Sequence, residues 1–260
     1  MKTLLVTFAA LSLAACGLLA QTPTMSCENQ GNHNRPHFCE IRESSITASS
    51  LTVDGRQNGG ITIKGADRAD ILVRAMVQSQ GESDAEARTT GAQVLVHTSG
   101  GAVRADGPAQ GNWSVAYEIF IPRHTDLSLK TVNGGVAISE VESSVEFHAV
   151  NGGISLKNVG GNVHGDTVNG GVSVNLGAGG WVGQGLDVTT KNGGVSMNVP
   201  EQFSALLDVA TVNGGVSVRL PNAEVRRGES HFSMTLGSGG PLIRVRTQNG
   251  GVSIKSGAKV

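Results

Sequence analysis

The sequence predicts an all-β protein, a parallel β-solenoid of the single-stranded β-helix type, preceded by an irregular N-terminal part that contains one short helix. Three observations support this fold class. The tripeptide Asn-Gly-Gly occurs seven times, apolar and polar residues alternate around its copies, and glycine makes up 37 of the 260 residues. Repetition at a nearly fixed period is typical of a stack of similar coils.

Residues 1–20 have the plan of a secretory signal peptide: one Lys, an apolar run too short to span a bilayer, and then small residues. Two processing sites remain open. The string "LAAC", which ends at Cys16, resembles the lipobox of bacterial lipoproteins, whereas "LLA" before Gln21 resembles an ordinary cleavage site. We expect an exported protein, either lipid-anchored in the cell envelope through Cys16 or periplasmic or extracellular after cleavage behind Ala20.

The segment 21–44 contains the other two cysteines, Cys27 and Cys39. In an oxidising compartment they are expected to form a disulfide, and closing a loop of about a dozen residues stabilises a fold by roughly 3 kcal/mol. A zinc site is the alternative, because His33 and His37 lie between the cysteines, although the spacing follows no standard zinc pattern. Free thiols at Cys27 and Cys39 are the third possibility.

Residues 45–126 are expected to cap the N-terminal end of the β-domain. Alternating apolar residues predict strands in 49–78 and again in 113–130, and a Ser/Asp cap predicts a short helix in 83–97. Such a cap is needed because an exposed strand edge invites pairing with another chain.

Residues 127–260 contain the regular repeat. Asn133, Asn151 and Asn169 lie 18 residues apart, the next steps are 23 and 21, and the last step, to Asn249, is 36. Apolar residues stand three and five places after each Asn and, with one glycine as exception, four and six places before it. Small or polar residues lie between them, so each stretch reads as a half-buried strand.

The parity of this alternation places each Asn inside the coil, where an unpaired amide costs about 2 kcal/mol or more. We therefore expect the amides to hydrogen-bond from coil to coil, about 4.8 Å apart, as a ladder. The two glycines are expected at a corner, where they provide positive φ and leave room for the coils above and below. The expected ladder residues are Asn133, Asn151, Asn169, Asn192, Asn213 and Asn249.

Two further expectations concern the repeat. Asn-Gly between apolar runs is also the typical signal of a β-hairpin, so a sandwich or meander of stacked hairpins is the alternative fold. The stretch 221–236 is expected to form the extra coil that fills the final gap of 36 residues.

The strings "LTVDGRQNGGITIKG" and "WSVAYEIFIPRHTDLSLKTVNGGVAI", with the Asn-Gly-Gly copies up to residue 255, resemble the bacterial putative-adhesin domain family over roughly residues 45–258. The Tyr-x-Ile-x-Ile-Pro motif followed by a Thr-Val-Asn-Gly strand is more specific than Asn-Gly-Gly by itself. The resemblance implies a β-solenoid with an adhesion-like role at the cell surface. No catalytic residue set accompanies the family, so no site is carried over.

The composition excludes nucleic-acid binding, because the formal net charge is -1 and no Lys/Arg cluster is present. Asp187 and Asp208, on adjacent repeats and joined by Asp166, are the best candidates for an acid pair or a Ca²⁺ site. The same outward columns also hold Ser, Glu, His, Lys and Arg, which favours a mixed solvated surface. His148 and His164 are likewise expected to be surface histidines.

Two apolar features remain as candidate contacts. Trp181 either projects as a binding anchor or packs on its own coil. The Val before the Asn forms either an outward apolar ridge or part of the corner, at Val132, Val150, Val168 and Val212. We predict a non-enzymatic, adhesin-like interaction module without metal or cofactor, with a protein or glycan partner in the envelope. The alternative is a polysaccharide-binding or polysaccharide-cleaving β-helix that uses the outward Asp row.

Overall fold

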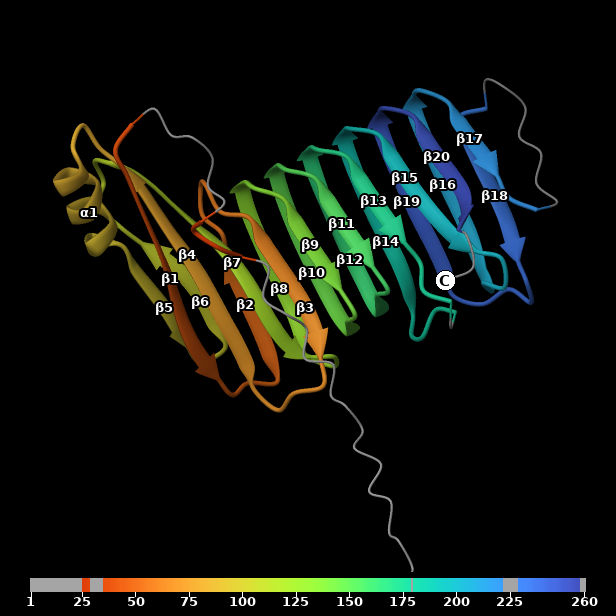
Figure 1. Cartoon of the computed structure of the whole chain (residues 1–260). Helices are drawn as coiled ribbons and strands as arrows, with labels where there is room; N and C mark the ends of the chain where they lie inside the picture. Colours follow the sequence, from red (N-terminus) through yellow and green to blue (C-terminus); the bar gives the residue numbers. More distant parts are fainter. Residues whose placement is uncertain (1–24, 29–34, 179, 222–228, 258–260) are drawn as a thin grey trace, which may run out of the picture.

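The chain is mostly β, with one short helix and two large, mostly parallel sheets in a solenoid-like arrangement (Figure 1). The prediction of a β-rich chain with a short helix is confirmed. The predicted signal peptide 1–20, with Cys16, lies outside the described residues. The computed structural model describes residues 25–28, 35–178, 180–221 and 229–257.

Twenty strands are found in the described residues, ten in each sheet. From neighbour to neighbour, sheet 1 contains β1 (His37–Ile46), β4 (Ile71–Gln80), β7 (Asn112–Pro122), β3 (Ile61–Ala66), β9 (Val136–Ser139), β11 (Ile154–Lys157), β13 (Val172–Asn175), β15 (Val195–Pro200), β20 (Val252–Gly257) and β17 (Val216–Arg219). Sheet 2 contains β18 (His231–Leu236), β16 (Ala205–Asn213), β19 (Leu242–Asn249), β14 (Gly185–Asn192), β12 (Gly160–Asn169), β10 (Glu142–Asn151), β8 (Asp126–Asn133), β2 (Ser50–Asp54), β6 (Ala102–Asp106) and β5 (Leu95–Ser99).

Each Asn-Gly-Gly corner joins a strand of sheet 2 to a strand of sheet 1, so one repeat is a coil of two strands. β8 continues into β9, β10 into β11 and β12 into β13. Neighbouring coils pair in parallel and in register: Val145 of β10 lies between Leu127 of β8 and Val163 of β12. The hairpin alternative is therefore wrong, because the two strands that flank a corner belong to different sheets.

The last coil of the sequence is not the last coil of the stack. β19 pairs with β14 on one side and with β16 on the other, and β20 lies between β15 and β17 in the same way. The expectation that 221–236 forms an extra coil is wrong. Residues 222–228 lie outside the described part, and β18 pairs antiparallel with β16, so that it covers an edge that would otherwise be open.

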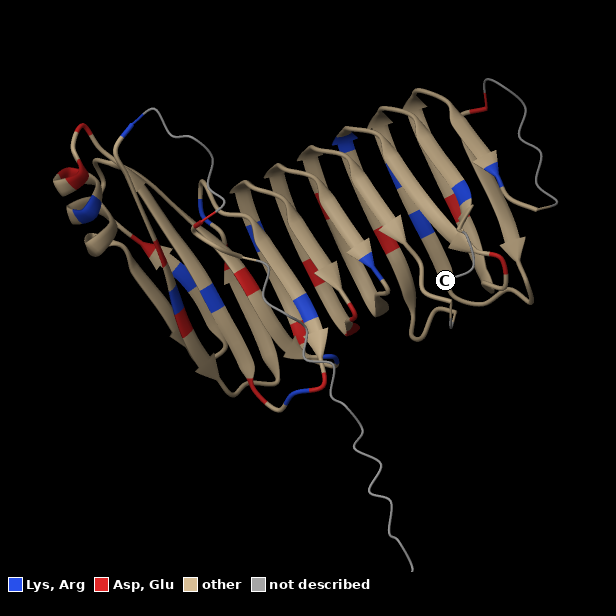
Figure 2. Ribbon diagram, in the orientation of Figure 1, with Lys and Arg blue, Asp and Glu red and all other residues tan. Residues whose placement is uncertain are grey.

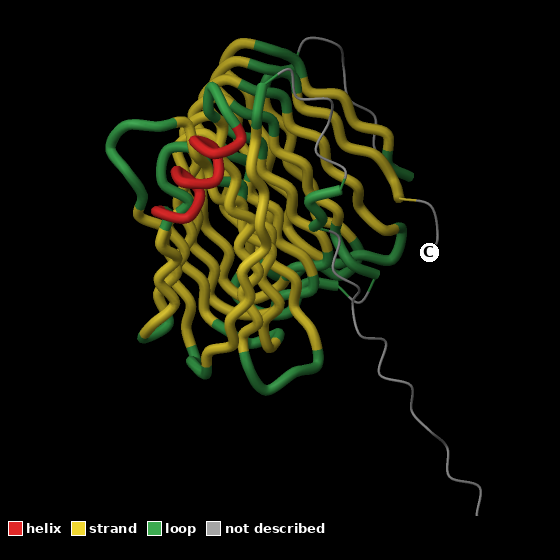
Figure 3. The backbone as a smooth tube through the Cα atoms, turned by 60° about the vertical axis from the view of Figure 1, so that its left-hand side comes forward, coloured by secondary structure: helices red, strands yellow, loops and turns green. Residues whose placement is uncertain are grey.

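The alternating apolar residues of the two sheets face each other and form one core along the stack. In β10, for example, Val145, Phe147 and Ala149 are buried while the residues between them are exposed. Figure 3 shows the strands as two layers, with the loops gathered at the long edges and the helix at the N-terminal end. Removal of this apolar surface from water is the main stabilising contribution.

The Asn side chains of the corners point outward, so the predicted inward orientation is wrong. In β8, Thr131 is the last buried residue and Asn133 is exposed, because the chain turns out of the sheet at the corner and the alternation ends. The exposed amides still contact one another: Asn151 Nδ2 donates to Asn133 Oδ1 at 2.8 Å. The same hydrogen bond runs through the stack in the order Asn213, Asn249, Asn192, Asn169, Asn151, Asn133 and Asn58.

Threonines fill the inner side of the corners. Thr131 Oγ1 donates to the carbonyl of Gly59 at 2.6 Å, and Thr167 Oγ1 donates to that of Gly152 at 2.8 Å. Equivalent hydrogen bonds are made by Thr190, Thr211 and Thr247. Each hydroxyl thus pairs with a corner carbonyl, which removes the penalty of burying that carbonyl unpaired.

The first glycine of a corner is required by close stacking rather than by its φ angle. A Cβ on Gly152 would lie 2.0 Å from the carbonyl oxygen of Gly134, and Gly170 meets the same obstacle. On the second glycine, Gly153, the nearest atom would be 3.3 Å away. The predicted positive φ is wrong for all corner glycines in the described chain except Gly250, at 156°.

Helix α1 (Asp84–Gln93) lies at the N-terminal end of the stack (Figure 1). The side chain of Ser83 caps it by accepting a hydrogen bond from the backbone N–H of Glu86. The helix is shorter than the predicted 83–97, because Val94 is extended and the residues from Leu95 onward pair with β6. At this end the sheets also change to antiparallel pairing, between β1, β4 and β7 and between β5 and β6.

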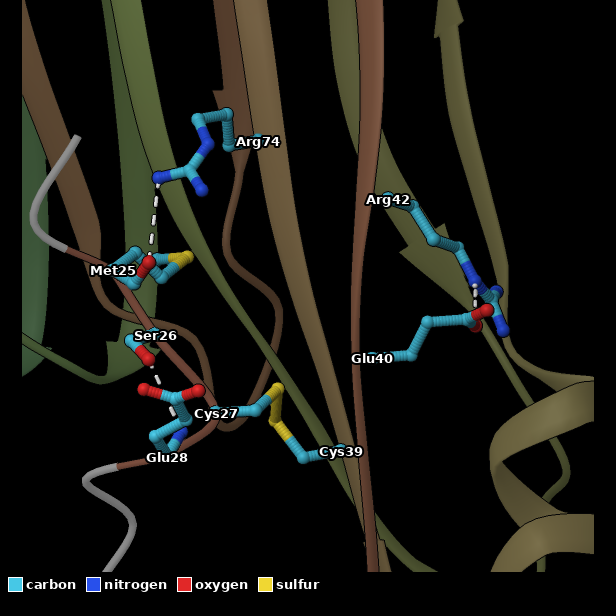
Figure 4. Close-up of a disulfide and its surroundings, with 8 residues drawn as sticks. All are labelled: Met25, Ser26, Cys27, Glu28, Cys39, Glu40, Arg42 and Arg74. Carbon is cyan, nitrogen blue, oxygen red and sulfur yellow. Dashed lines mark hydrogen bonds and ion pairs between the residues drawn. A yellow bond between two sulfur atoms is a disulfide. The ribbon is translucent and has the colours of Figure 1, made fainter.

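Cys27 and Cys39 form a disulfide, with their Cα atoms 5.8 Å apart (Figure 4). The predicted disulfide is confirmed, and the zinc alternative is wrong, because both sulfur atoms are consumed; His33 lies outside the described residues. The bond ties the segment Met25–Glu28 to β1 on the outer face of sheet 1. There Met25 N donates to Glu118 Oε2 at 3.3 Å.

Candidate functional site

The predicted Asp row lies on the outer face of sheet 2, but not as an acid pair on adjacent coils. The coil order places Arg244 of β19 between Asp187 of β14 and Asp208 of β16. The two carboxylates are therefore two strand spacings apart, about 9.6 Å. Arg244 Nε lies 3.0 Å from Asp208 Oδ2, and its Nη1 lies 3.5 Å from Asp187 Oδ2. Figure 2 shows acidic and basic residues interspersed along the sheets.

Asp208 is held ionised by its neighbours. Burial by itself raises the pKa of Asp208, but hydrogen bonds from His231, at 2.8 Å, and from Arg244 outweigh this effect and lower the pKa below its ordinary value. Glycoside hydrolysis needs a general acid with a raised pKa. Asp208 is therefore unsuited to act as the general acid of the alternative enzymatic function.

We expect Asp208→Asn to lower the free energy of unfolding by about 1 kcal/mol at pH 7, because it weakens hydrogen bonds between charged groups. The folded-state pKa of Asp208 is lowered, so its stabilisation is present above the unfolded value of about 3.9 and is lost as the pH falls through the folded value. Urea unfolding at pH 7 and at about pH 3 checks this. The difference in the free energy of unfolding between the wild type and the variant should be smaller at the lower pH.

The matched control for this prediction is Asp166→Asn, which removes a more exposed carboxylate of the same face. Asp166 Oδ2 lies 2.9 Å from His148 Nδ1, and the side chains of both residues are about half exposed. Such exposed pairs contribute little, so this variant should change stability less than Asp208→Asn. For Asp208→Asn, the same difference from the wild type in the free energy of unfolding at both pH values would contradict the ion pairs of Asp208 with His231 and Arg244.

The two outward histidines do not face each other. In the register of β10 and β12, His148 pairs with Asp166, whereas His164 lies opposite Glu146. Within the described ranges, no group of three His, Cys, Asp or Glu side chains is placed to hold a metal ion.

Trp181 packs on its own coil instead of projecting. It is 8% exposed, and its Nε1 donates to the carbonyl of Gly161 at 3.1 Å. The interpretation of Trp181 as a binding anchor is wrong, because the indole closes the core beneath the β13–β14 connection.

The valines before the Asn point outward, but the coil order divides them. Val132 and Val212 are exposed, at 39% and 71%, and Val150 and Val168 are partly exposed. In the stack, the corresponding positions between Val168 and Val212 are occupied by Lys191 and Gln248. The predicted ridge is therefore a run of three valines, with Val212 separate from it.

A cleft of about 370 Å³ opens where the regular corners end. We call it the corner cleft; it is lined by the first corner, Gly55–Asn58, and by residues between Ala105 and Tyr117, which come from the end of β6, the β6–β7 connection and the first half of β7. Tyr117 of β7 pairs with Ile61 of β3, so β6 and β7 take the place of one more coil. Between these paired positions, Arg104 and Tyr117 are 13 residues apart, whereas Asp54 and Ile61 are seven apart. The longer stretch has no Asn-Gly-Gly, so it does not stack on the first corner as the later corners stack on each other.

The first corner is also one residue longer than the next. Asp54 pairs with Lys130, yet Asn58 comes four residues after Asp54, whereas Asn133 comes three after Lys130. Arg56 accommodates the extra residue with a φ of 54°, in the left-handed region that non-glycine residues rarely adopt. Strain of this kind is often found at functional sites.

Tyr117 lines the corner cleft from within the core. It is 1% exposed, and its hydroxyl has no hydrogen-bond partner in the part of the chain that the structure describes. Burial raises the pKa of Tyr117 strongly, and the carboxylate of Asp54 raises it further, so the hydroxyl stays protonated. A buried hydroxyl without a partner costs about 1–3 kcal/mol. Tyr117 is therefore a candidate contact for a bound molecule.

Charged and aromatic side chains form the rim of the cleft. The guanidinium of Arg56 forms an ion pair with Asp106, which also lies 3.2 Å from His97 Nε2 and 3.5 Å from Arg104 Nε. Trp113 is fixed by a hydrogen bond from its Nε1 to the carbonyl of Pro108 at 3.0 Å.

Sequence reasoning predicted the strand that holds Trp113 and Tyr117 but not the cleft. Two signals were present in the first repeat: it is one residue longer, and Gly55 stands where the next coil has Thr131. Neither signal shows that the β6–β7 connection lies beside this corner, because that follows from the order of the strands in the two sheets.

A family model described as Toastrack DUF4097 matches residues 43–255. A putative cell adhesion protein from Clostridium sporogenes ATCC 15579 is 12% identical, with a TM-score of 0.42 over 85% of this chain and 100% of that chain. A putative adhesin from Bacteroides fragilis NCTC 9343 is 15% identical, with a TM-score of 0.34 over 84% and 97%. A putative lipid binding protein from Parabacteroides distasonis ATCC 8503 is 11% identical, with a TM-score of 0.34 over 85% of this chain and 97% of that chain.

No curated protein matches the chain. None of the helices in the described residues is both long and apolar enough to span a membrane.

Proposed function

The chain belongs to the Toastrack DUF4097 family, and on that premise we propose that it is a non-catalytic interaction module of the bacterial cell envelope, exported and held at the membrane by a lipid on Cys16. Its architecture is, in this proposal, one parallel β-solenoid, with residues 45–126 as the capping part and 127–260 as the coils. The partner is a protein or a glycan of the envelope or surface.

One observation carries the non-catalytic assignment: Arg244 lies between the two carboxylates that the enzymatic alternative requires. Asp187 and Asp208 each form an ion pair with this guanidinium, and the pKa of Asp208 is lowered. Carboxylates that share one guanidinium are paired, so neither is a free nucleophile, and Asp208, with its lowered pKa, is a poor proton donor. The Asp row on the outer face of sheet 2 therefore supports no acid–base chemistry in this proposal.

The cysteine usage and the position of Met25 support the proposed anchoring. Cys16 is the one cysteine of the sequence outside the disulfide. Met25 is held on the outer face of sheet 1, where Glu118 accepts a hydrogen bond from its N–H. The residues between Cys16 and Met25 reach at most about 30 Å. A lipid on Cys16 therefore keeps the N-terminal end of the stack close to the membrane.

Metabolic labelling with radioactive fatty acid tests the anchor. The wild type should take up the label and sediment with membranes, whereas Cys16→Ser should remain unlabelled and move to the soluble fraction. The double variant Cys27→Ser with Cys39→Ser is the matched control and should keep its label. An unlabelled wild type, as expected after cleavage behind Ala20, would contradict lipid anchoring.

The non-catalytic assignment is tested separately with envelope polysaccharide as substrate. The wild type and the double variant Asp187→Ala with Asp208→Ala should both release no reducing ends, and both should capture the same envelope partner in a pull-down. Release of reducing ends by the wild type but not by the double variant would establish the enzymatic alternative instead.

A further inference from the structure

We propose that the corner cleft binds one ring of a neutral sugar, with the indole of Trp113 against the apolar side of the ring and with Tyr117 and Asn58 hydrogen-bonded to its hydroxyls. This inference deepens the proposed function and rests on it, because it gives the interaction module a specific ligand class. Four features of the cleft support it.

The first feature is the unpaired hydroxyl of Tyr117. It is deeply buried and lines the cleft, so water competes with a ligand poorly there. A phenol hydroxyl both donates and accepts a hydrogen bond, as a sugar hydroxyl does. Since the raised pKa of Tyr117 keeps its proton on, the group offers both functions at neutral pH.

The second feature is the end of the Asn ladder. Every amide in the stack donates its Nδ2 hydrogen to the next Oδ1 towards the N-terminal end, and Asn58 accepts the last of these hydrogen bonds, from Asn133 at 3.2 Å. Aligned hydrogen bonds polarise one another. Asn58 lines the cleft, and the β6–β7 connection beyond it offers no further corner amide. Among the described corners its Nδ2 is thus the terminal donor of the ladder and is available to an acceptor oxygen.

The third feature is the pairing of the charges beside the cleft. Asp106 is paired with Arg56 and also lies near Arg104 and His97, and Asp54, which precedes the cleft residue Gly55, is paired with Lys130 at 3.3 Å. An anionic ligand would approach these two carboxylates, and a cationic ligand would compete with the basic groups already paired with them. The neutral, hydrogen-bonding surface that remains is suited to an uncharged polyhydroxylated ligand.

The fourth feature is the shape of the cleft. Its volume of about 370 Å³ is near the lower end of the range for small-molecule sites, which begins at about 300 Å³. Trp113 supplies the flat apolar wall and is held in place by Pro108 and by Gly107, where a Cβ would come within 2.6 Å of the ring. An indole beside a few placed polar groups is the combination that holds a ring with one apolar side and several hydroxyls.

The test is a fluorescence titration of the full mature chain with glucose, galactose, mannose and N-acetylglucosamine at millimolar concentrations. Trp113 and Trp181 are the two tryptophans of the chain, so in a Trp181→Phe background the signal reports on the cleft alone. At least one of the sugars should shift the emission of Trp113 with saturation. If none does, the inference is overturned.

Tyr117→Phe is the decisive variant, because it removes a hydroxyl that has no hydrogen-bond partner among the described residues. Its melting temperature should equal or exceed that of the wild type, while sugar affinity should fall about tenfold, the loss expected for one hydrogen bond. Unchanged affinity overturns the inference. Tighter binding of glucuronate than of glucose also overturns the inference, because it would show that the cleft binds an anion.

Two ladder variants form a matched pair. Asn58→Ala and Asn213→Ala each remove one ladder hydrogen bond, at opposite ends of the stack. Only Asn58→Ala should weaken sugar binding. If both variants weaken it equally, the ladder acts on the cleft through stability and the direct role of Asn58 is contradicted.

Maltotetraose and cellotetraose distinguish a glycan from a free sugar. Tighter binding of a tetrasaccharide than of glucose assigns the cleft to a unit of a chain, and equal binding assigns it to a free sugar. Binding without cleavage supports both the cleft and the non-catalytic function. Cleavage of a tetrasaccharide contradicts the proposed function, whereas intact tetrasaccharides without binding contradict the cleft alone.

Discussion

Gly152→Ala is expected to destabilise the protein by about 3 kcal/mol or more, the upper range for overpacking. The added methyl group would lie 2.0 Å from the carbonyl oxygen of Gly134 and 2.4 Å from its carbonyl carbon. Both obstacles are backbone atoms of the neighbouring coil, so the methyl group fits only if two stacked corners separate. Their separation would also disturb the hydrogen bond from Thr167 to the carbonyl of Gly152. Chemical unfolding in urea measures the loss.

The adjacent glycine provides the control for this prediction. A Cβ on Gly153 would meet its nearest atom, the carbonyl oxygen of Gly171, at 3.3 Å, a contact that a small shift can relieve. Gly153→Ala should therefore cost less than about 1 kcal/mol. Equal destabilisation by the two variants would show that the corner needs glycine for its conformational freedom, and not for the close approach of the coils.

Glu118→Ala is expected to cost about 4 kcal/mol, because it breaks a buried ion-pair network from its centre. Glu118 is 1% exposed; its Oε2 pairs with Arg74 Nη1 at 2.5 Å and its Oε1 with Lys64 Nζ at 2.8 Å. Without the carboxylate, two cations remain on a covered surface without their main partner. Met25, which lies against Arg74 in Figure 4, would lose the acceptor of its N–H as well. Thermal and urea unfolding measure the loss.

Glu43 is the exposed partner of the same arginine and supplies the control. Its Oε1 lies 2.8 Å from Arg74 Nε, but its side chain is 54% exposed. Removal of such an exposed pair costs at most about 1 kcal/mol, so Glu43→Ala should be nearly neutral. A similar loss for both variants would mean that the segment Met25–Glu28 does not shield Glu118 from water.

The regular coils could be predicted from the sequence because their alternation and their period depend on local pattern alone. The buried Val, Ile and Leu positions around Asn151 were read correctly in this way. The direction of the Asn side chains was predicted wrongly. Side chains alternate between the two faces only while the chain stays in the sheet, and after Thr131 the chain turns out of it. The Thr hydroxyls bonded to the corner carbonyls were missed although the residue recurs two places before most of the Asn residues.

The order of the coils could not be predicted, because identical repeats pair equally well with any other copy. Sequence order alone puts Asp208 beside Asp187, whereas the structure inserts Arg244 between them. That one exchange turns a candidate acid pair into an ion-pair network. The corner cleft was hidden for the same reason, since it depends on which segment lies beside Gly55–Asn58.

The placement of the last coil is tested most directly by cross-linking introduced cysteines at the exposed corners. Asn192→Cys with Asn249→Cys places two thiols on neighbouring coils, one strand spacing of about 4.8 Å apart, and Asn192→Cys with Asn213→Cys places them two spacings apart. With a thiol reagent that spans one spacing but not two, the first pair should cross-link within the chain and the second should not. Cross-linking of the second pair and not of the first would contradict the inserted coil, and with it the position of Arg244 between the two carboxylates.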